Sequence, residues 1–314
     1  MRAILVSAFG GPEVLVPAEV PDPKAGPGDV VVRLRAAGVN PVETYVRSGA
    51  YGHLPPLPYI PGADGAGDLV AVGLEVVGLR PGDRVYVAGA PSYAEMVCAP
   101  AEVVWPLADH LTYEQGAAIG IPYRTAYLAL VTVTGARPGD RVLVRGGSGG
   151  VGTAAIQLAR ALGCSVVATA GSKDGRSLVI EEGAIAVAAH DDDKRLSDLA
   201  DGRGYDVIVE MRADRNLDSD LHLLADGGRV AVVGSRGRTE IDPRMLLNRS
   251  SSIRGVFGST AEERRRAHLA IGAGLAQRTL RPVVGRLLPL REAAEAHRLV
   301  LSPGARGKIV LVMV

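Results

Sequence analysis

The stretch Arg141-Val-Leu-Val-Arg-Gly-Gly-Ser-Gly-Gly-Val-Gly152 decides the fold of this 314-residue chain. Its first four residues are mostly β-branched or aliphatic, and the pattern Gly147-x-Gly149-x-x-Gly152 follows them. From Val151 to Leu162 the apolar residues recur at helical spacing, and Gly163 stands where a helix commonly ends. The sequence therefore predicts a strand, a tight glycine turn and a helix, in that order.

A turn of this kind favours a bound dinucleotide. A side chain at these glycines would block both the turn and the approach of a pyrophosphate. The N-terminus of the helix offers free N–H groups and a positive dipole end to the phosphates. We therefore expect a dinucleotide at Gly147, Ser148, Gly149, Gly150, Val151 and Gly152. The alternative is a glycine turn that serves only close packing.

Strands and helices alternate through the region that follows this loop. The expected strands are 165–170, 184–188, 205–210 and 229–234, and the expected helical stretches are 173–182, 197–199 and 217–224. Alternating units of this length imply right-handed crossovers and a parallel sheet with helices on both faces. Residues 121–261 are therefore predicted to form an α/β domain of the doubly wound (Rossmann) kind.

The first 120 residues have a different pattern, in which short β-rich runs follow glycine or proline turns. These runs are Val30–Leu34, Asp68–Val72, Val85–Ala88 and Ser92–Cys98. Such spacing is typical of a β-barrel or sandwich. Near the end of the chain, Ala261–Gln277 is expected to be a helix and Gly307–Val314 a strand that rejoins the first lobe. The predicted domains are thus 1–120 completed by 262–314, and 121–261.

Composition argues against several classes of protein. The formal net charge is +1, from 35 basic and 34 acidic residues, so the net charge gives no electrostatic attraction to nucleic acid or an anionic membrane. Two cysteines, Cys98 and Cys164, are too few for a disulfide framework. No apolar run approaches the ~20 residues of a membrane span, and the start does not resemble a signal sequence. These features predict a cytoplasmic protein.

The tip of the second strand distinguishes NAD from NADP. NAD enzymes usually place an acid there, about 20 residues after the loop, to hold the ribose hydroxyls. The residues here are Thr169-Ala-Gly-Ser-Lys-Asp-Gly-Arg176, so Ser172 and Lys173 are the first polar side chains. A hydroxyl and a cation favour a 2′-phosphate and hence NADPH. Two points stand against this: Asp174 follows directly, and Lys173 could be an ordinary solvated residue at the start of a helix.

Six motifs along nearly the whole chain carry a resemblance to a known family. They are Ala37–Gly49, Pro58–Gly67, Gln115–Tyr123, Ser148–Gly152, Gly227–Arg236 and Ala294–His297. They resemble the zeta-crystallin-like quinone oxidoreductase branch of the medium-chain dehydrogenase/reductase superfamily. This resemblance implies a mostly β, GroES-like N-terminal domain beside the Rossmann domain. It also implies a homodimer and an enzyme that passes hydride or electrons from NADPH to quinones.

The resemblance also implies the site residues. Asn40, Tyr45 and Tyr51 would be catalytic, with Tyr45 at the nicotinamide and Asn40 donating to a quinone oxygen as charge develops there. Further cofactor contacts would be Gly171, His190, Asn216, Val233, Gly234, Ser235, Arg236, Val256, Phe257 and Gly258. Packing alone is the alternative for Tyr45, and an ordinary surface position is the alternative for His190.

Zinc alcohol dehydrogenases of the same superfamily bind their catalytic zinc through Cys, His and Cys. The resemblance places Gly38-Val-Asn40 at the first cysteine and Gly62-Ala63-Asp64 where those enzymes have Gly-His-Glu, and no cysteine lies near Ile119–Tyr123. Tetrahedral zinc needs three or four converging donors. We therefore expect a zinc-independent enzyme, because a quinone needs less polarisation than an alcohol does.

Two other functions stay open. An NADPH-dependent reductase of α,β-unsaturated carbonyls would share every motif named above. Members of this branch are also credited with single-stranded RNA binding and with a structural role in the lens. The balanced charge, and the lack of aromatic residues within a basic stripe, argue against nucleic acid as the main partner. The run Arg264-Arg-Arg266 fits a solvated helix face better than a binding patch.

Overall fold

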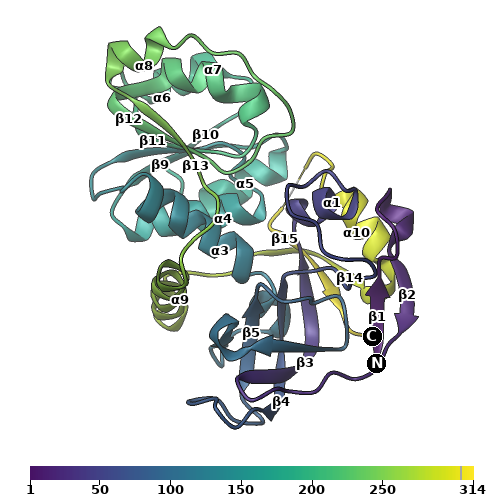
Figure 1. The fold of residues 1–314 in the computed structure, drawn as a ribbon. Helices are drawn as coiled ribbons and strands as arrows, with labels where there is room; N and C mark the ends of the chain where they lie inside the picture. The colour runs from purple at the N-terminus through teal and green to yellow at the C-terminus, as the bar shows by residue number, and fades with distance from the viewer. Residues whose placement is uncertain (305) are drawn as a thin grey trace. The chain divides into compact units, whose positions relative to one another are not determined.

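The computed structural model describes residues 1–304 and 306–314 of the chain, which divides into two units (Figure 1). The first unit joins Met1–Ile121 to Pro282–Val314, and the second is Pro122–Arg281. The first boundary lies close to the predicted one. The second boundary differs, because residues 262–281 belong to the second unit and not to the first.

Hydrogen bonds explain why the chain re-enters the first unit at Pro282 and not at the predicted residue 262. Gln157 Nε2 donates to the carbonyl of Arg281 at 2.8 Å, and the amide of Arg281 donates to Gln157 Oε1 at 2.8 Å. The Arg281 guanidinium also pairs with Glu182 at 2.7 Å. The segment that follows helix α9 (Ala261–Ala276) is therefore held to the second unit.

Six parallel strands form the sheet of residues 122–281, in the order β10-β9-β8-β11-β12-β13. Their bounds are β8 Arg141–Val144, β9 Ser165–Thr169, β10 Ala186–Ala188, β11 Tyr205–Glu210, β12 Leu224–Val232 and β13 Ser252–Gly255. This is the strand order of a doubly wound nucleotide-binding fold. The predicted Rossmann domain is thereby confirmed.

Helices cover both faces of this sheet. Their bounds are α3 Gly120–Tyr127, which continues as a π-helix over Leu128–Val133, then α4 Gly150–Ala161, α5 Lys173–Glu181, α6 Asp193–Leu199, α7 Ala213–Leu223 and α8 Arg244–Arg249. In Figure 1, α6 and α7 lie on one face and α4 on the other. Apolar side chains such as Leu196, Leu217 and Leu221 pack against the strand residues Leu143 and Ile208.

The described residues of the first unit form a seven-stranded sheet of mostly antiparallel strands, in the order β14-β15-β3-β4-β5-β7, with β6 paired to β3. The bounds are β3 Asp29–Val39, β4 Asp64–Val72, β5 Arg84–Ala88, β6 Met96–Pro100, β7 Val104–Pro106, β14 Val284–Pro289 and β15 Lys308–Val312. Strands β1 (Arg2–Leu5) and β2 (Val16–Glu19) pair separately. The predicted GroES-like β domain is confirmed.

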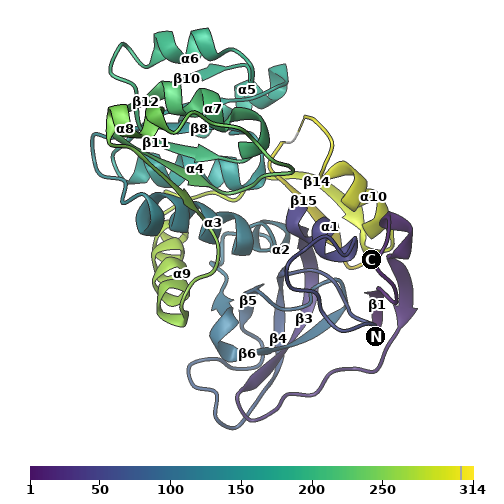
Figure 2. The ribbon, with the colours of Figure 1, turned by 45° about the horizontal axis from the view of Figure 1, so that its top comes forward.

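The C-terminal segment completes this first sheet, as expected. Strand β15 runs antiparallel to β3, with Ile309 opposite Val39 and Val310 opposite Gly38, and β14 flanks β15 (Figure 2). The short helices of the unit are α1 Pro41–Arg47, α2 Tyr113–Gly116 and α10 Ala293–Leu299. The start of α1 directly follows the end of β3, so Asn40 lies at the junction of strand and helix.

None of the helices in residues 1–304 and 306–314 combines the length and the apolar character that crossing a membrane would require.

Candidate functional site

The glycine loop lies between β8 and α4, where Gly149 is the residue before the helix. A Cβ at Gly152 would lie 2.2 Å from the carbonyl oxygen of Gly146, and one at Gly147 would lie 2.8 Å from Cβ of Ala168. These two glycines therefore allow close packing of the loop. A Cβ at Gly149 would meet only the Gly146 oxygen, at 3.8 Å. The loop is thus open at Gly149, beside the helix N-terminus that attracts anions.

The tip of β9 lies against the same loop. Ser172 is the N-cap of α5, and its Oγ accepts a hydrogen bond from the amide of Gly175 at 3.0 Å. A Cβ at Gly175 would be 2.9 Å from Ser172 Oγ and 3.1 Å from Ser148 Oγ, so these two hydroxyls flank one position. Lys173 is exposed and Arg176 is half-buried on the first turns of α5.

His190 follows β10 and lies over Gly171. A Cβ at Gly171 would be 3.2 Å from His190 Nε2. His190 Nδ1 lies 2.9 Å from Thr169 Oγ1, which accepts from the amide of Gly146 at 3.0 Å and can donate its own hydrogen to Nδ1. Burial, aided by the nearby charge of Arg145, lowers the pKa of His190. The ring is therefore neutral near pH 7, and with Nδ1 bonded to Thr169 it can present Nε2–H to a ligand.

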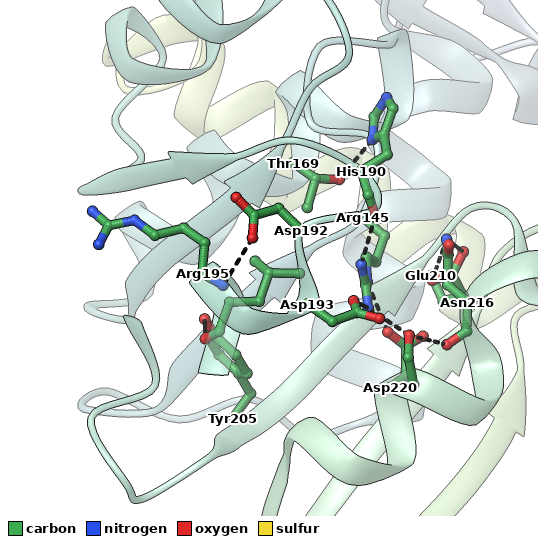
Figure 3. A network of polar contacts seen from close by, with 12 residues as sticks. Arg145, Thr169, His190, Asp192, Asp193, Arg195, Tyr205, Glu210, Asn216 and Asp220 are labelled. Atoms are coloured by element: carbon green, nitrogen blue, oxygen red, sulfur yellow. Dashed lines mark hydrogen bonds and ion pairs between the residues drawn. The ribbon is translucent and has the colours of Figure 1, made fainter. Parts of the chain in front are cut away.

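Arg145 joins the loops at this edge of the sheet (Figure 3). Its side chain is 1% exposed and donates to Asp220 Oδ1 at 2.8 Å, to Asp193 Oδ1 at 3.0 Å and to the His190 carbonyl at 3.0 Å. Burial, with the nearby charge of Glu210, raises the pKa of Asp220. Sequence reasoning did not single out Arg145. A charged residue at the end of a buried strand, directly before the glycine loop, is the signal that could have identified it.

Asn216 lies on the first turn of α7. Its Nδ2 is within 3.1 and 3.2 Å of the two carboxylate oxygens of the buried Glu210, the last residue of β11. A carboxylate can only accept, so the amide nitrogen must face Glu210 and the Oδ1 acceptor points elsewhere. The pair therefore sets the orientation of the Asn216 amide (Figure 3).

The remaining cofactor candidates follow the last two strands. Residues 233–236 come directly after β12, and 256–258 directly after β13. The amide of Val256 donates to the carbonyl of Val232 at 2.8 Å, which joins the two segments. Phe257 is 74% exposed. All cofactor candidates of the second unit thus lie at the carboxyl ends of its strands, where ligands of doubly wound sheets bind.

In the first unit, Asn40 is 2% exposed and fully engaged in hydrogen bonds. Its Nδ2 donates to Glu43 Oε1 and to Asp64 Oδ2, each at 2.9 Å. Its Oδ1 accepts from the Lys308 ammonium. In this arrangement both amide hydrogens are used within the protein, so none is left to donate to a ligand as the sequence analysis expected.

Tyr45 and Tyr51 lie in different settings. Tyr45 is half-buried on α1, and its hydroxyl has no hydrogen-bond partner among the described residues. Tyr51 is half-buried in the segment that follows α1. The Tyr45 hydroxyl is therefore available to a ligand.

A second buried polar chain continues from Asn40. Tyr93 donates to Glu43 Oε2 at 2.6 Å, and the same hydroxyl lies 3.1 Å from His297 Nε2. Because the hydrogen of Tyr93 goes to Glu43, Nε2 of His297 must carry a hydrogen and donate it to the Tyr93 oxygen. Burial raises the pKa of Glu43 to about 6 and lowers that of His297 to about 3. Glu43 and His297 both lie within the motifs that carry the family resemblance, but neither was assigned a role from the sequence.

The chain is similar to known proteins in both of its units. The model of the alcohol dehydrogenase GroES-like domain matches residues 26–109, and that of the zinc-binding dehydrogenase matches residues 150–271. The quinone oxidoreductase of Lama guanicoe is 46% identical over 322 residues, covering 100% of this chain and 98% of that protein. The chain belongs to the quinone oxidoreductase family. The human relative is 45% identical with the same coverage.

Solved structures agree with this family. A mycobacterial protein solved in complex with NADPH has a TM-score of 0.91 and 30% identity, with full coverage of both chains. A structure described as an NAD-dependent alcohol dehydrogenase has a TM-score of 0.94 and 34% identity, also with full coverage. The predicted membership of the medium-chain dehydrogenase/reductase superfamily is confirmed, and the protein is an oxidoreductase.

One of the two matching family models is that of the zinc-binding dehydrogenases. A zinc site in this chain would need three or four side chains that converge as ligands. The segments expected to carry zinc ligands supply the amide of Asn40, the methyl group of Ala63 and the main chain near Ile121. Within the part of the chain that the structure describes, no three His, Cys, Asp or Glu side chains gather in a group that could hold a metal. These residues do not fit a tetrahedral zinc.

Proposed function

We propose that this protein is a zinc-independent NADPH:quinone oxidoreductase. The observation that carries the proposal is the open glycine loop at Gly149, at the carboxyl edge of a doubly wound sheet, in a chain 45% identical to quinone oxidoreductases over its full length. The loop supports a nicotinamide dinucleotide, and the relatives support a quinone as the acceptor.

NADPH is favoured over NADH by the tip of β9. The hydroxyl of Ser172 accepts from Gly175, so its own hydrogen remains for a phosphate oxygen. Lys173 and Arg176 add cationic side chains on the first turns of α5, whose N-terminal dipole has the same sign. One similar structure is described as NAD-dependent and another is a complex with NADPH, so the preference for NADPH in this chain is argued from Ser172, Lys173 and Arg176.

The chain's own residues orient and shield the reaction, and bound NADPH supplies the hydride from C4 of its nicotinamide. Tyr45 orients the nicotinamide or the substrate through its available hydroxyl. Asn40 acts as a positioning residue, because its amide is held by Glu43, Asp64 and Lys308. A quinone gains aromaticity on reduction and needs little polarisation, so orientation and exclusion of water suffice.

One assay tests this proposal. The protein is mixed with NADPH and 9,10-phenanthrenequinone, with and without prior treatment by a strong chelator, and the nicotinamide absorbance is followed. Oxidation of NADPH that survives the chelator, in protein free of stoichiometric zinc, supports the proposal. Chelator-sensitive activity with stoichiometric zinc contradicts it. Preference for an enone over the quinone would instead favour a reductase of α,β-unsaturated carbonyls.

We also propose a homodimer built on the edge of the nucleotide sheet. Strand β13 is an edge strand of that sheet within residues 122–281 and leaves one side without a strand partner there. Light scattering coupled to gel filtration tests this, and a monomeric mass contradicts it.

A further inference from the structure

A lysine and an aspartate form an almost fully buried ion pair inside the first unit. Lys308 Nζ lies 2.9 Å from Asp64 Oδ2, with side chains 4% and 0% exposed. Lys308 is the first residue of β15, and Asp64 is the first residue of β4. Lysine is almost never buried without a partner, so the pair is a built feature of this sheet.

Three segments meet at the Asp64 carboxylate. Asn40 donates to Oδ2 at 2.9 Å, and the amide of Ile121 donates to Oδ1 at 2.8 Å. Asp64 itself follows Ala63. By the superfamily resemblance these are the segments that carry the catalytic zinc ligands in zinc alcohol dehydrogenases. Here they converge on a carboxylate, and the positive charge beside it belongs to Lys308.

Two glycines make room for the pair. A Cβ at Gly38 would lie 2.7 Å from Cε of Lys308 and 2.1 Å from the carbonyl oxygen of Ala117. A Cβ at Gly120 would lie 2.3 Å from Asp64 Oδ1. Side chains at either position would displace the lysine or the aspartate. Both glycines belong to the motifs that carry the family resemblance, so the room for the pair is part of the same pattern.

The balance of charge makes the ammonium necessary. Two buried carboxyl groups, Asp64 and Glu43, both contact the amide of Asn40, and Lys308 is the cation that contacts the same amide. A buried carboxylate without a cation is strongly unfavourable. The ammonium also holds the Asn40 carbonyl, which directs the two amide hydrogens toward the carboxyl groups.

We propose that Lys308 is the built-in cation of the catalytic unit, taking the electrostatic place of the metal ion of the zinc enzymes and positioning Asn40. This rests on the proposed zinc-independent function. A charge carried by the chain cannot be removed by a chelator, and a divalent cation at the same place would face the repulsion of the ammonium. Lys308 is thus a positioning residue that acts through Asn40.

The first test measures stability and needs no substrate. Lys308→Met keeps most of the length of the side chain but removes its charge, and should lower the unfolding midpoint by about 10 °C. The double variant Asp64→Asn/Lys308→Met should recover most of this loss, because residue 64 then carries no charge and Glu43, whose pKa burial already raises to about 6, can take up a proton. Lys194→Met, at an exposed lysine of α6, is the matched control. Equal midpoints for Lys308→Met and wild type would overturn the proposal.

The second test is chemical rescue. Lys308→Ala leaves space for a small amine, so methylammonium should raise its unfolding midpoint and its quinone turnover, whereas tetramethylammonium should do neither. In Lys308→Met, kcat should fall while the KM for NADPH stays unchanged, because the dinucleotide loop is in the other unit. If wild type lacks quinone activity, the proposed function fails and the midpoints still decide the role of Lys308. Rescue by neither the amine nor the double variant would refute it.

Discussion

The Tyr93 hydroxyl donates a 2.6 Å hydrogen bond to Glu43 Oε2, although the two residues are 50 positions apart and both are buried. The same hydroxyl lies 3.1 Å from His297 Nε2. The carboxyl group of Glu43 and the imidazole of His297 thus both contact the hydroxyl of Tyr93, and all three side chains are buried. Burial disfavours the charged form of each, so their effects on stability have opposite dependence on pH.

Glu43→Gln should change how stability varies in mild acid. Burial raises the pKa of Glu43 from its usual 4.5 to about 6. The folded state therefore binds the proton more tightly than the unfolded chain does, and this contribution is full below pH 4.5 and lost as the pH rises through 6. It amounts to about 2 kcal/mol. Urea denaturation at pH 4 and 7 should show the gap between wild type and variant change by this amount. Parallel pH profiles would contradict the assignment.

His297→Gln should have the opposite effect. Burial, with the charge of Arg47, lowers the pKa of His297 from 6.5 to about 3. The unfolded chain therefore takes up the proton first, and stability is full above pH 6.5 and falls as the pH drops toward 3. At pH 5 the loss is about 2 kcal/mol. The glutamine keeps an N–H donor for Tyr93 but cannot protonate, so the variant should resist mild acid better than wild type in the same urea titrations. Equal sensitivity to acid would show that His297 titrates normally.

The second unit was largely predictable because its signals are local. Strands β8, β9 and β11 and helices α4 and α5 lie close to their expected bounds, since hydrophobic periodicity and glycine turns act over a few residues. The sequence analysis missed α8 and β13. Strand β13 is Ser-Ile-Arg-Gly, with a single apolar side chain, and it is ordered by pairing with β12.

The polar interior of the first unit was not predictable in the same way. Asn40 and Lys308 are 268 positions apart, and no local pattern indicates that a lysine after Gly307 is buried. Resemblance alone pointed to Asn40, and the sequence analysis expected its amide to face a quinone. The structure instead surrounds that amide with Glu43, Asp64 and Lys308, partners that only the folded sheet brings together.

Gly149→Val and Gly152→Val should separate cofactor binding from folding. A Cβ at Gly149 meets nothing closer than 3.8 Å, so the variant should keep a wild-type unfolding midpoint while the new side chain blocks a pyrophosphate. A Cβ at Gly152 would lie 2.2 Å from the Gly146 oxygen, so that variant should be destabilised. NADPH fluorescence enhancement and thermal unfolding check both outcomes. Normal NADPH binding by a folded Gly149→Val variant would exclude this loop as the phosphate site.

Lys173→Glu should weaken NADPH far more than NADH. Lys173 is exposed beside Ser172 at the start of α5, where a cation can pair with a 2′-phosphate but has little to hold on a ribose hydroxyl. Loss of one charge-assisted hydrogen bond costs about 1.5–3 kcal/mol, or roughly ten- to a hundredfold in affinity. Titration of each cofactor by fluorescence measures the two changes. Arg203→Glu, at an exposed position in the turn before β11, makes the same change of charge at the opposite end of a strand and should alter neither affinity. An equal loss for NADPH and NADH would place the phosphate elsewhere, with Arg176 and His190 as the next residues to replace.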